Sequence, residues 1–150
     1  MWCANRKNFV TEVGRFTRNR PLTAQMTTAR RKMGQLAEDL AAARLAAAGW
    51  EIVARNARTR YGELDLVARD GRALVFVEVK AGRVGAPYGP ERPIEAIDHR
   101  KQRQVRRLAA AWLAENPGLP YWAEIRFDAI GISFGPGGEI AEYEHIENAF

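Results

Sequence analysis

Apolar residues between Arg30 and Ala48 recur every three or four positions, and Gly49 follows them. This spacing predicts an amphipathic helix that ends at a glycine. Its apolar positions are Met33, Leu36, Ala37, Leu40, Ala43 and Ala47. Residues 1–28 show no such period and are rich in Asn, Thr and Arg, so we expect residues 1–29 to form a disordered or loosely attached basic arm. An over-long gene start is the alternative, since Met26 and Met33 lie close to the beginning of the helical pattern.

Further along the chain, alternating apolar and polar residues predict short strands. We expect strands over Glu51–Ala54, Glu63–Arg69, Ala73–Lys80 and Glu124–Ser133, and a second long helix over about Ile94–Ala114. Glycines and prolines between Arg83 and Pro93 predict a loop, and the acidic tail after Gly138 gives no clear pattern. The order helix, strand, strand, strand, helix, strand predicts one α/β domain over residues 30–150, with helices flanking a mixed sheet.

The composition fits an ordinary globular protein, since 47% of the 150 residues are hydrophobic and 27% are charged. The single cysteine, Cys3, excludes a disulfide framework and a thiolate zinc site, and the two histidines exclude HExxH zinc chemistry. No apolar run approaches the roughly 20 residues of a membrane span, and the N-terminus lacks the apolar segment of a secretion signal. We therefore expect a cytoplasmic protein without a membrane partner.

The net charge of +5 favours a nucleic-acid partner only where the basic residues gather. Residues 1–32 hold eight basic residues and one acidic residue, which leaves the rest of the chain with a net charge of −2. That part contains two basic clusters, the first being Arg55, Arg58 and Arg60, and the second Arg100, Lys101, Arg103, Arg106 and Arg107. In the predicted second helix Arg100, Arg103 and Arg107 share one face, and few acidic residues lie three or four positions away. We expect these clusters to contact the phosphates of a nucleic acid.

The second and third strands are joined by Asp70-Gly71, a strong signal for a two-residue hairpin turn. Counting outward from that turn places Asp65 opposite Phe76 and Glu63 opposite Glu78. Because strand side chains alternate, four charged residues then share one face: Glu63, Asp65, Glu78 and Lys80. The opposite face is apolar and should be covered by a helix; it consists of Leu64, Leu66, Ala68, Val75, Val77 and Val79.

Three carboxylates and one lysine on a single face repel each other unless something else binds there. Two carboxylates about 5 Å apart repel by roughly 3 kcal/mol at an effective dielectric constant of 20. A solvated sheet face with a salt bridge is the simplest alternative. The excess negative charge suits a divalent cation such as Mg²⁺, which binds one or two carboxylates and several waters. Lys80 would lie beside the cation, where it can orient or deprotonate a water and stabilise charge on a phosphorane.

The spacing of these residues resembles the core of the PD-(D/E)XK nuclease superfamily. Asp65 is followed, after twelve intervening residues, by Glu78-Val79-Lys80, although Leu64 stands where the idealised motif has proline. Over roughly residues 31–150 the chain resembles more closely the bacterial YraN family of endonuclease-like proteins. The strings that carry this resemblance are Ala37-Glu38-Asp39-Leu40-Ala41, Arg55-Asn56, Gly62-Glu63-Leu64-Asp65-Leu66, Val75-Phe76-Val77-Glu78-Val79-Lys80, Arg100-Lys101-Gln102 and Arg126-Phe127-Asp128.

The resemblance implies a restriction-endonuclease-like fold and an endonuclease that hydrolyses DNA with Mg²⁺ or Mn²⁺. The family is similar in core to archaeal Holliday-junction resolvases, which use an extra glutamate on the first helix as a metal ligand, and Glu38 holds that position. The implied metal ligands are therefore Asp65, Glu78 and Glu38, and the expected catalytic residues are these three with Lys80 and Glu63. A homodimer would suit symmetric cutting of two strands, but no motif specifies an interface. The sequence leaves the substrate open between duplex, branched and single-stranded DNA, and RNA.

Two other functions stay open. A nucleic-acid-binding module in DNA processing or uptake would keep the fold and the basic helix without any chemistry. A protein-interaction domain would instead hold the acidic cluster against the arginines of a partner. Near the C-terminus we expect Arg126 and Asp128 to form an ion pair on the sheet surface, and His145 to be solvated.

Overall fold

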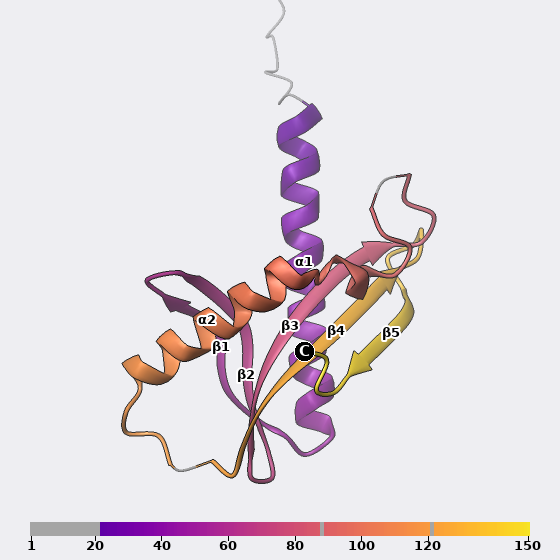
Figure 1. Ribbon diagram of the computed structural model, residues 1–150. Coiled ribbons are helices and arrows are strands. Elements are labelled where there is room, and N and C mark those ends of the chain that lie inside the picture. Colours follow the sequence, from indigo (N-terminus) through magenta and orange to yellow (C-terminus); the bar gives the residue numbers. More distant parts are fainter. Residues whose placement is uncertain (1–21, 88, 121) are drawn as a thin grey trace, which may run out of the picture.

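A five-stranded mixed sheet lies between two helices (Figure 1). The computed structural model describes residues 22–87, 89–120 and 122–150. The elements follow in the order α1 (Leu22–Ala47), β1 (Glu51–Thr59), β2 (Gly62–Asp70), β3 (Ala73–Arg83), η1 (Pro93–Ala96), α2 (His99–Glu115), β4 (Glu124–Phe134) and β5 (Ile140–Ile146). The strands lie side by side in chain order, and all neighbours are antiparallel except β3 and β4. The expected mixed α/β architecture is confirmed, and it is consistent with a nuclease-like fold.

Alternation along β3 divides its side chains between two hydrophobic cores. Val75, Val77 and Val79 belong to the core beneath α1, whereas Leu74 and Phe76 belong to the core beneath α2. The strand is therefore buried on both faces, as expected for a strand with a parallel neighbour inside a layered fold. This double cover makes β3 a rigid support for the residues at its carboxyl end.

The first helix begins earlier than predicted. It starts at Leu22 and not at Arg30, so residues 22–29 of the expected arm are helical. Residues 1–21, the rest of that arm, lie outside the described residues. Residues 26–32 are exposed, and Figure 1 shows this end of α1 projecting beyond the sheet.

The buried stripe of α1 also differs from the prediction. Ala37, Ala41 and Leu45 are buried, whereas Leu36 is 46% exposed. Alanines are so frequent in this segment that several stripes have helical spacing, and the pattern alone does not choose between them. The structure selects the stripe whose small side chains pack under the valines of β3.

The hairpin between β2 and β3 has a register that differs by two residues from the prediction. Asp70 pairs with Ala73, so the central turn residues are Gly71 and Arg72. Gly71 has a φ of 56°, a conformation that favours glycine at the first central position of a hairpin turn. Asp70 is held by Arg126, which donates to its carboxylate at 3.1 Å, and this contact favours keeping it in the strand. A shift of two residues leaves every paired side chain on its predicted face.

Three other elements differ from the prediction. β1 continues to Thr59, and the acidic tail forms β5, which pairs with β4. The expected second helix is divided into η1 and α2, because the Asp98 side chain caps α2 by accepting a hydrogen bond from the Lys101 backbone N–H at 2.7 Å. In the part of the chain that the structure describes, no helix is long and apolar enough to cross a membrane.

Candidate active site

The predicted acidic residues lie where β2 and β3 separate. Backbone pairing between the strands ends at Leu66 and Val77, and Figure 1 shows the two strands diverging above their turn. Beyond this point the Asp65 side chain takes the place of a backbone acceptor, since its Oδ2 accepts a hydrogen bond from the Val79 N–H at 2.8 Å. The backbone of β3 therefore fixes the Asp65 carboxylate at the junction of the two strands.

Glu78 is the most buried charged group of the site. Only 1% of its side chain is exposed, and two lysines contact the same oxygen, Oε1. Lys80 donates to it from the same strand, and the Nζ of Lys101 approaches it from α2 at 2.9 Å. A buried carboxylate needs such partners. Lys101, which we expected to contact phosphate, thus has its ammonium at the acidic site.

The third predicted acid comes from α1. The Glu38 carboxylate accepts a hydrogen bond from the Asn56 side chain of β1 at 2.6 Å. Asn56 has a φ of 47°, in the left-handed region that Asn tolerates better than most residues. The adjacent Arg55 pairs with Asp39 of α1. Two neighbouring residues of β1 therefore fasten that strand to α1 and orient Glu38.

One cavity of about 670 Å³ unites these groups, since Glu38, Asp65, Glu78, Lys80 and Lys101 all line it. The rest of its wall consists of residues of α1 between 26 and 34, of further residues of β3 between 79 and 83, and of the loop and η1 that follow β3. The structure therefore brings together four of the five predicted catalytic residues. It also places the predicted glycine- and proline-containing loop at the cavity rim.

Burial raises the pKa of the Asp65 carboxyl, and the charge of Glu78 raises it further. The Val79 N–H and the Lys80 ammonium act in the opposite direction, but the pKa remains at about 7, against an ordinary value of 3.8. This direction indicates that Asp65 and Glu78 share a poorly solvated space in which their negative charges repel each other.

The donor set suits a hard divalent cation. Mg²⁺ prefers oxygen ligands and is commonly held by one or two carboxylates with water in the other positions. Asp65 and Glu78 form such a pair, and a cation would relieve their repulsion. In residues 22–150, as far as they are described, no three side chains of His, Cys, Asp or Glu converge closely enough to hold a metal by themselves. Glu38 therefore lines the cavity without completing a three-carboxylate cluster.

Glu63 lies apart from this group. It pairs with Arg58 across β1 and β2, with 3.8 Å between the Arg58 Nε and the Glu63 Oε2, and 43% of its side chain is exposed. The prediction that Glu63 faces Glu78 is wrong, because the register is shifted by two residues and the strands have separated before Glu63. In the first basic cluster, Arg55 and Arg58 of β1 have carboxylate partners, whereas Arg60, in the turn after β1, packs against the ring of Tyr61.

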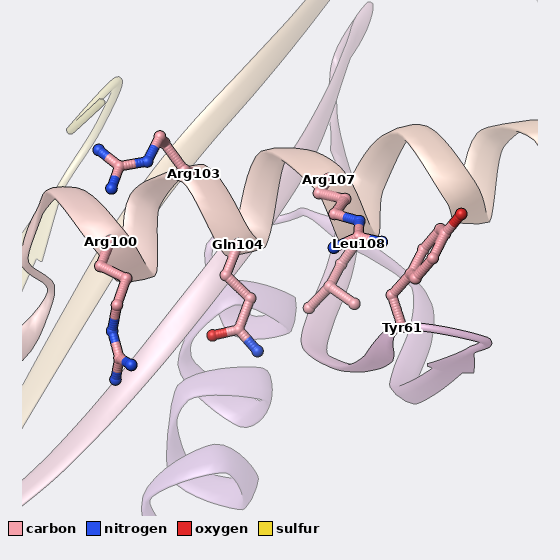
Figure 2. A pocket seen from close by; sticks show the side chains of 6 residues that line it. All are labelled: Tyr61, Arg100, Arg103, Gln104, Arg107 and Leu108. Carbon is pink, nitrogen blue, oxygen red and sulfur yellow. The ribbon is translucent and has the colours of Figure 1, made fainter.

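A separate groove of about 540 Å³ runs along α2 (Figure 2). Its lining residues are Tyr61, Arg100, Arg103, Gln104, Arg107 and Leu108. The predicted common face of Arg100, Arg103 and Arg107 is confirmed, since all three line this one groove. Tyr61 comes from the turn between β1 and β2, and the Arg107 guanidinium carbon lies 3.8 Å from the centroid of its ring.

Sequence reasoning gave no role to Asn56 or Tyr61, and it gave Lys101 a different one. For Lys101, the helical spacing contained a usable signal. Lys101 lies one residue after Arg100, so its side chain points to a different part of the helix surface from the three arginines. The signal at Asn56 was its residue type, because Asn is enriched where φ is positive. No local signal marks Tyr61, because its contact with α2 arises only from tertiary packing.

Arg126 and Asp128 form part of a buried network and not the expected surface ion pair. Asp128 is fully buried and contacts Arg126, the His145 Nε2 at 2.9 Å and the Asn148 N–H at 3.0 Å. Burial raises the pKa of the Asp128 carboxyl, but the hydrogen bonds from His145 and Arg126 outweigh this effect and hold the pKa below its ordinary value of 3.8. His145, which we expected to be solvated, is thus a structural partner supplied by β5.

Comparison with known proteins identifies the family. Residues 37–132 match the model of the uncharacterised protein family UPF0102. A UPF0102 protein of Rhodococcus opacus is 48% identical over 118 residues, or 79% of this chain and 95% of that protein. One of Nocardia farcinica is 50% identical over 105 residues (70% and 79%), and one of Geobacter metallireducens is 43% identical over 125 residues (83% and 97%). The matched region contains every residue named above for the acidic cavity from Glu38 to Lys101, and the chain belongs to the UPF0102 (YraN) family.

Proposed function

We propose that this protein is a metal-dependent endonuclease that hydrolyses phosphodiester bonds in DNA. One observation carries the proposal. Asp65 and Glu78 share a poorly solvated space at the divergence of two strands, and the Lys80 ammonium lies beside them at a cavity. Two carboxylates and a lysine in this relation supply a cation site and a positive charge next to it.

Each residue of the site has a different proposed role. Asp65 and Glu78 would hold Mg²⁺ or Mn²⁺, with Glu38 on the same cavity wall. When bound, the cation would activate water and polarise a phosphoryl oxygen. Lys80, whose side chain is 28% exposed, can stabilise the negative charge that develops on the phosphoryl group. Lys101 contacts the same oxygen of Glu78 from α2 and orients its carboxylate, and the neighbouring arginines of α2 bind phosphates next to the scissile bond.

Cleavage of DNA by the Lys80→Ala variant tests the chemistry. We expect cleavage of a panel of linear and branched DNAs with Mg²⁺ or Mn²⁺ to fall by about 10²-fold or more, because a positioned electrostatic or proton-transfer group is lost. DNA affinity should change little. Lys32→Ala is the matched control, since Lys32 is an exposed lysine of α1 outside the cavity. Cleavage by Lys80→Ala at the parental rate would show that the proposed chemistry is wrong.

Binding of Mn²⁺ tests the cation site independently of activity. Titration calorimetry of the parent should give binding heats that the Asp65→Asn variant lacks, because a neutral amide is a much weaker ligand than a carboxylate. Glu63→Gln is the matched control: it removes a carboxylate two residues away that lies outside the cavity. Equal heats for the parent and for Asp65→Asn would refute the site.

Lys101 favours a second candidate function, a nucleic-acid-binding module without chemistry. With Lys80 and Lys101 both at Glu78, two lysines face Asp65 and Glu78, so the buried charges can balance without a cation. Such a module would bind DNA in a salt-dependent manner that is indifferent to Mg²⁺ and to Asp65→Asn. The Mn²⁺ titration therefore separates the two candidates before any cleavage is measured.

A further inference from the structure

The groove along α2 contains an aromatic ring among its arginines. Tyr61 is held in a tight turn, where its N–H donates to the Thr59 hydroxyl at 3.1 Å. The turn lies close against α2, because a Cβ added at Gly62 would be 3.4 Å from the Leu108 side chain. Tyr61 is nevertheless 38% exposed and lines the groove.

Two guanidinium groups lie against this ring. The Arg107 carbon is 3.8 Å from its centroid and the Arg60 carbon is 4.6 Å away, and Arg60 is exposed. Phosphate binding requires only the cations of the groove, so it leaves the tyrosine unexplained. A planar ring and a planar guanidinium are the surfaces on which proteins stack unpaired bases.

The cations of the groove are available for a ligand. Within the described part of the chain, Arg100, Arg103 and Arg107 form no ion pair with a carboxylate. Along α2, Arg100 is about 10 Å from Arg107, at 1.5 Å of rise per residue. One strand of B-DNA has a phosphate about every 3.4 Å along the helix axis, so this length corresponds to about three phosphate steps.

One end of the groove lies next to the acidic cavity along α2. Lys101 follows Arg100 directly in α2, and its ammonium contacts Glu78 at 2.9 Å. Tyr61 and Arg107 lie at the other end, about 9 Å further along the helix axis. A strand bound along α2 would therefore have one end at Glu78 and a nucleotide at Tyr61 within a few nucleotides of it.

We propose that the groove binds an unpaired nucleotide of a DNA strand, with Arg100 and Arg103 on its phosphates and its base stacked on the ring of Tyr61. The base displaces the exposed Arg60 from the ring, and Arg107 stays against it. Bases inside a duplex already stack on their neighbours and present no free face, so this site selects single-stranded or branched DNA. The inference deepens the proposed function, on which it rests, by naming the substrate class.

Binding without cleavage tests this inference. In EDTA, fluorescence anisotropy would measure the affinity for a labelled single strand of about 15 nucleotides and for the duplex of the same sequence. We expect Tyr61→Leu to weaken single-strand binding about tenfold and duplex binding less than twofold, because one stacked base is lost. Tyr61→Phe, which keeps the ring, should bind like the parent. A single strand that carries 2-aminopurine gives a second measurement. The fluorescence of this base should be quenched on binding to the parent and to Tyr61→Phe, but not on binding to Tyr61→Leu.

Two outcomes would overturn the inference: an equal loss of single-strand and duplex affinity in Tyr61→Leu, or no loss in either. The proposed function fails separately, through absent Mn²⁺ binding or through cleavage by Lys80→Ala at the parental rate. Stacking without cleavage would keep the inference and support the binding-module alternative. Cleavage that depends on Lys80 but not on Tyr61 would keep the nuclease and remove the stacking site.

Discussion

The Asp65 carboxylate has a structural role beside its proposed chemical one. It satisfies the Val79 N–H at the point where β2 no longer supplies a backbone acceptor. An unpaired backbone N–H in this position would destabilise the fold by about 1 to 3 kcal/mol. Asparagine keeps an oxygen that can accept the hydrogen bond, whereas alanine does not. Asp65→Asn is therefore the variant that separates loss of a ligand from loss of the fold.

Asn56 combines a left-handed backbone with a hydrogen bond to Glu38. We expect Asn56→Ala to be less stable than Asn56→Gly by about 1 kcal/mol, because both lose the hydrogen bond but only alanine is strained at this φ. Chemical denaturation of the two variants measures the difference. The reverse order of stabilities would mean that the backbone at residue 56 is not left-handed in solution.

At the residue scale, alternation along two strands was enough to predict that Asp65, Glu78 and Lys80 lie together. The prediction was not affected by the error in register, because a shift of two residues does not change which residues of a strand point to the same side. It failed for Glu63, since no local pattern reveals that paired strands separate. The Lys101 contact with Glu78 also needed tertiary information, namely where α2 docks on the sheet.

At the scale of elements, α2 connects the two halves of the candidate site. Its apolar residues pack on β2 and β3, its Lys101 contacts Glu78, and its arginines line the groove. The sequence predicted this helix and its arginine face because both follow from helical spacing. It did not predict that the helix starts as late as His99, because this start depends on the cap by Asp98. It also did not predict the buried stripe of α1, because the many alanines of that helix allow several stripes with helical spacing.

The arginine face of α2 should govern the salt dependence of DNA binding. Replacing Arg100 and Arg103 together by Gln should weaken binding and reduce the slope of log K against log salt by about 2, since each phosphate contact contributes about one unit. Anisotropy titrations at several salt concentrations give the slope. Arg69→Gln with Arg72→Gln removes the same charge near the β2–β3 turn and should leave the slope nearly unchanged. Equal slopes for the parent and the Arg100 and Arg103 variant would contradict this assignment.

For the molecule as a whole, the Asp128 network joins separate parts of the chain. Its carboxylate binds Arg126 of β4 and His145 of β5, and Arg126 also reaches Asp70 at the β2–β3 turn at 3.1 Å and Glu147 at 3.5 Å. Breaking a buried charge pair by removing one partner commonly destabilises a protein by about 3 to 5 kcal/mol. We therefore expect Asp128→Asn to lower the free energy of unfolding by about 3 kcal/mol at neutral pH.

The same network predicts how stability depends on pH. The pKa of Asp128 is lower in the folded protein than its ordinary value of 3.8. As the pH falls, the unfolded chain therefore takes up this proton before the folded protein does. The ionised carboxylate stabilises the fold fully above the ordinary pKa, and this stabilisation is lost as the pH falls through the pKa of the folded protein. Denaturation of the parent and of Asp128→Asn at pH 7, 5 and 3 checks this. The difference in unfolding free energy between them should shrink only in the most acidic sample.

The end of the backbone pairing between β2 and β3 also bears on how members of such a family can diverge. The turn that carries Tyr61 projects past the last paired residues and touches α2, while Glu78 and Lys80 remain within the central strand. Under the proposed function, insertions, deletions or exchanges in that turn would change which nucleic acids fit the groove without moving the acidic residues. Substrate preference can therefore drift over generations while the chemistry is inherited unchanged.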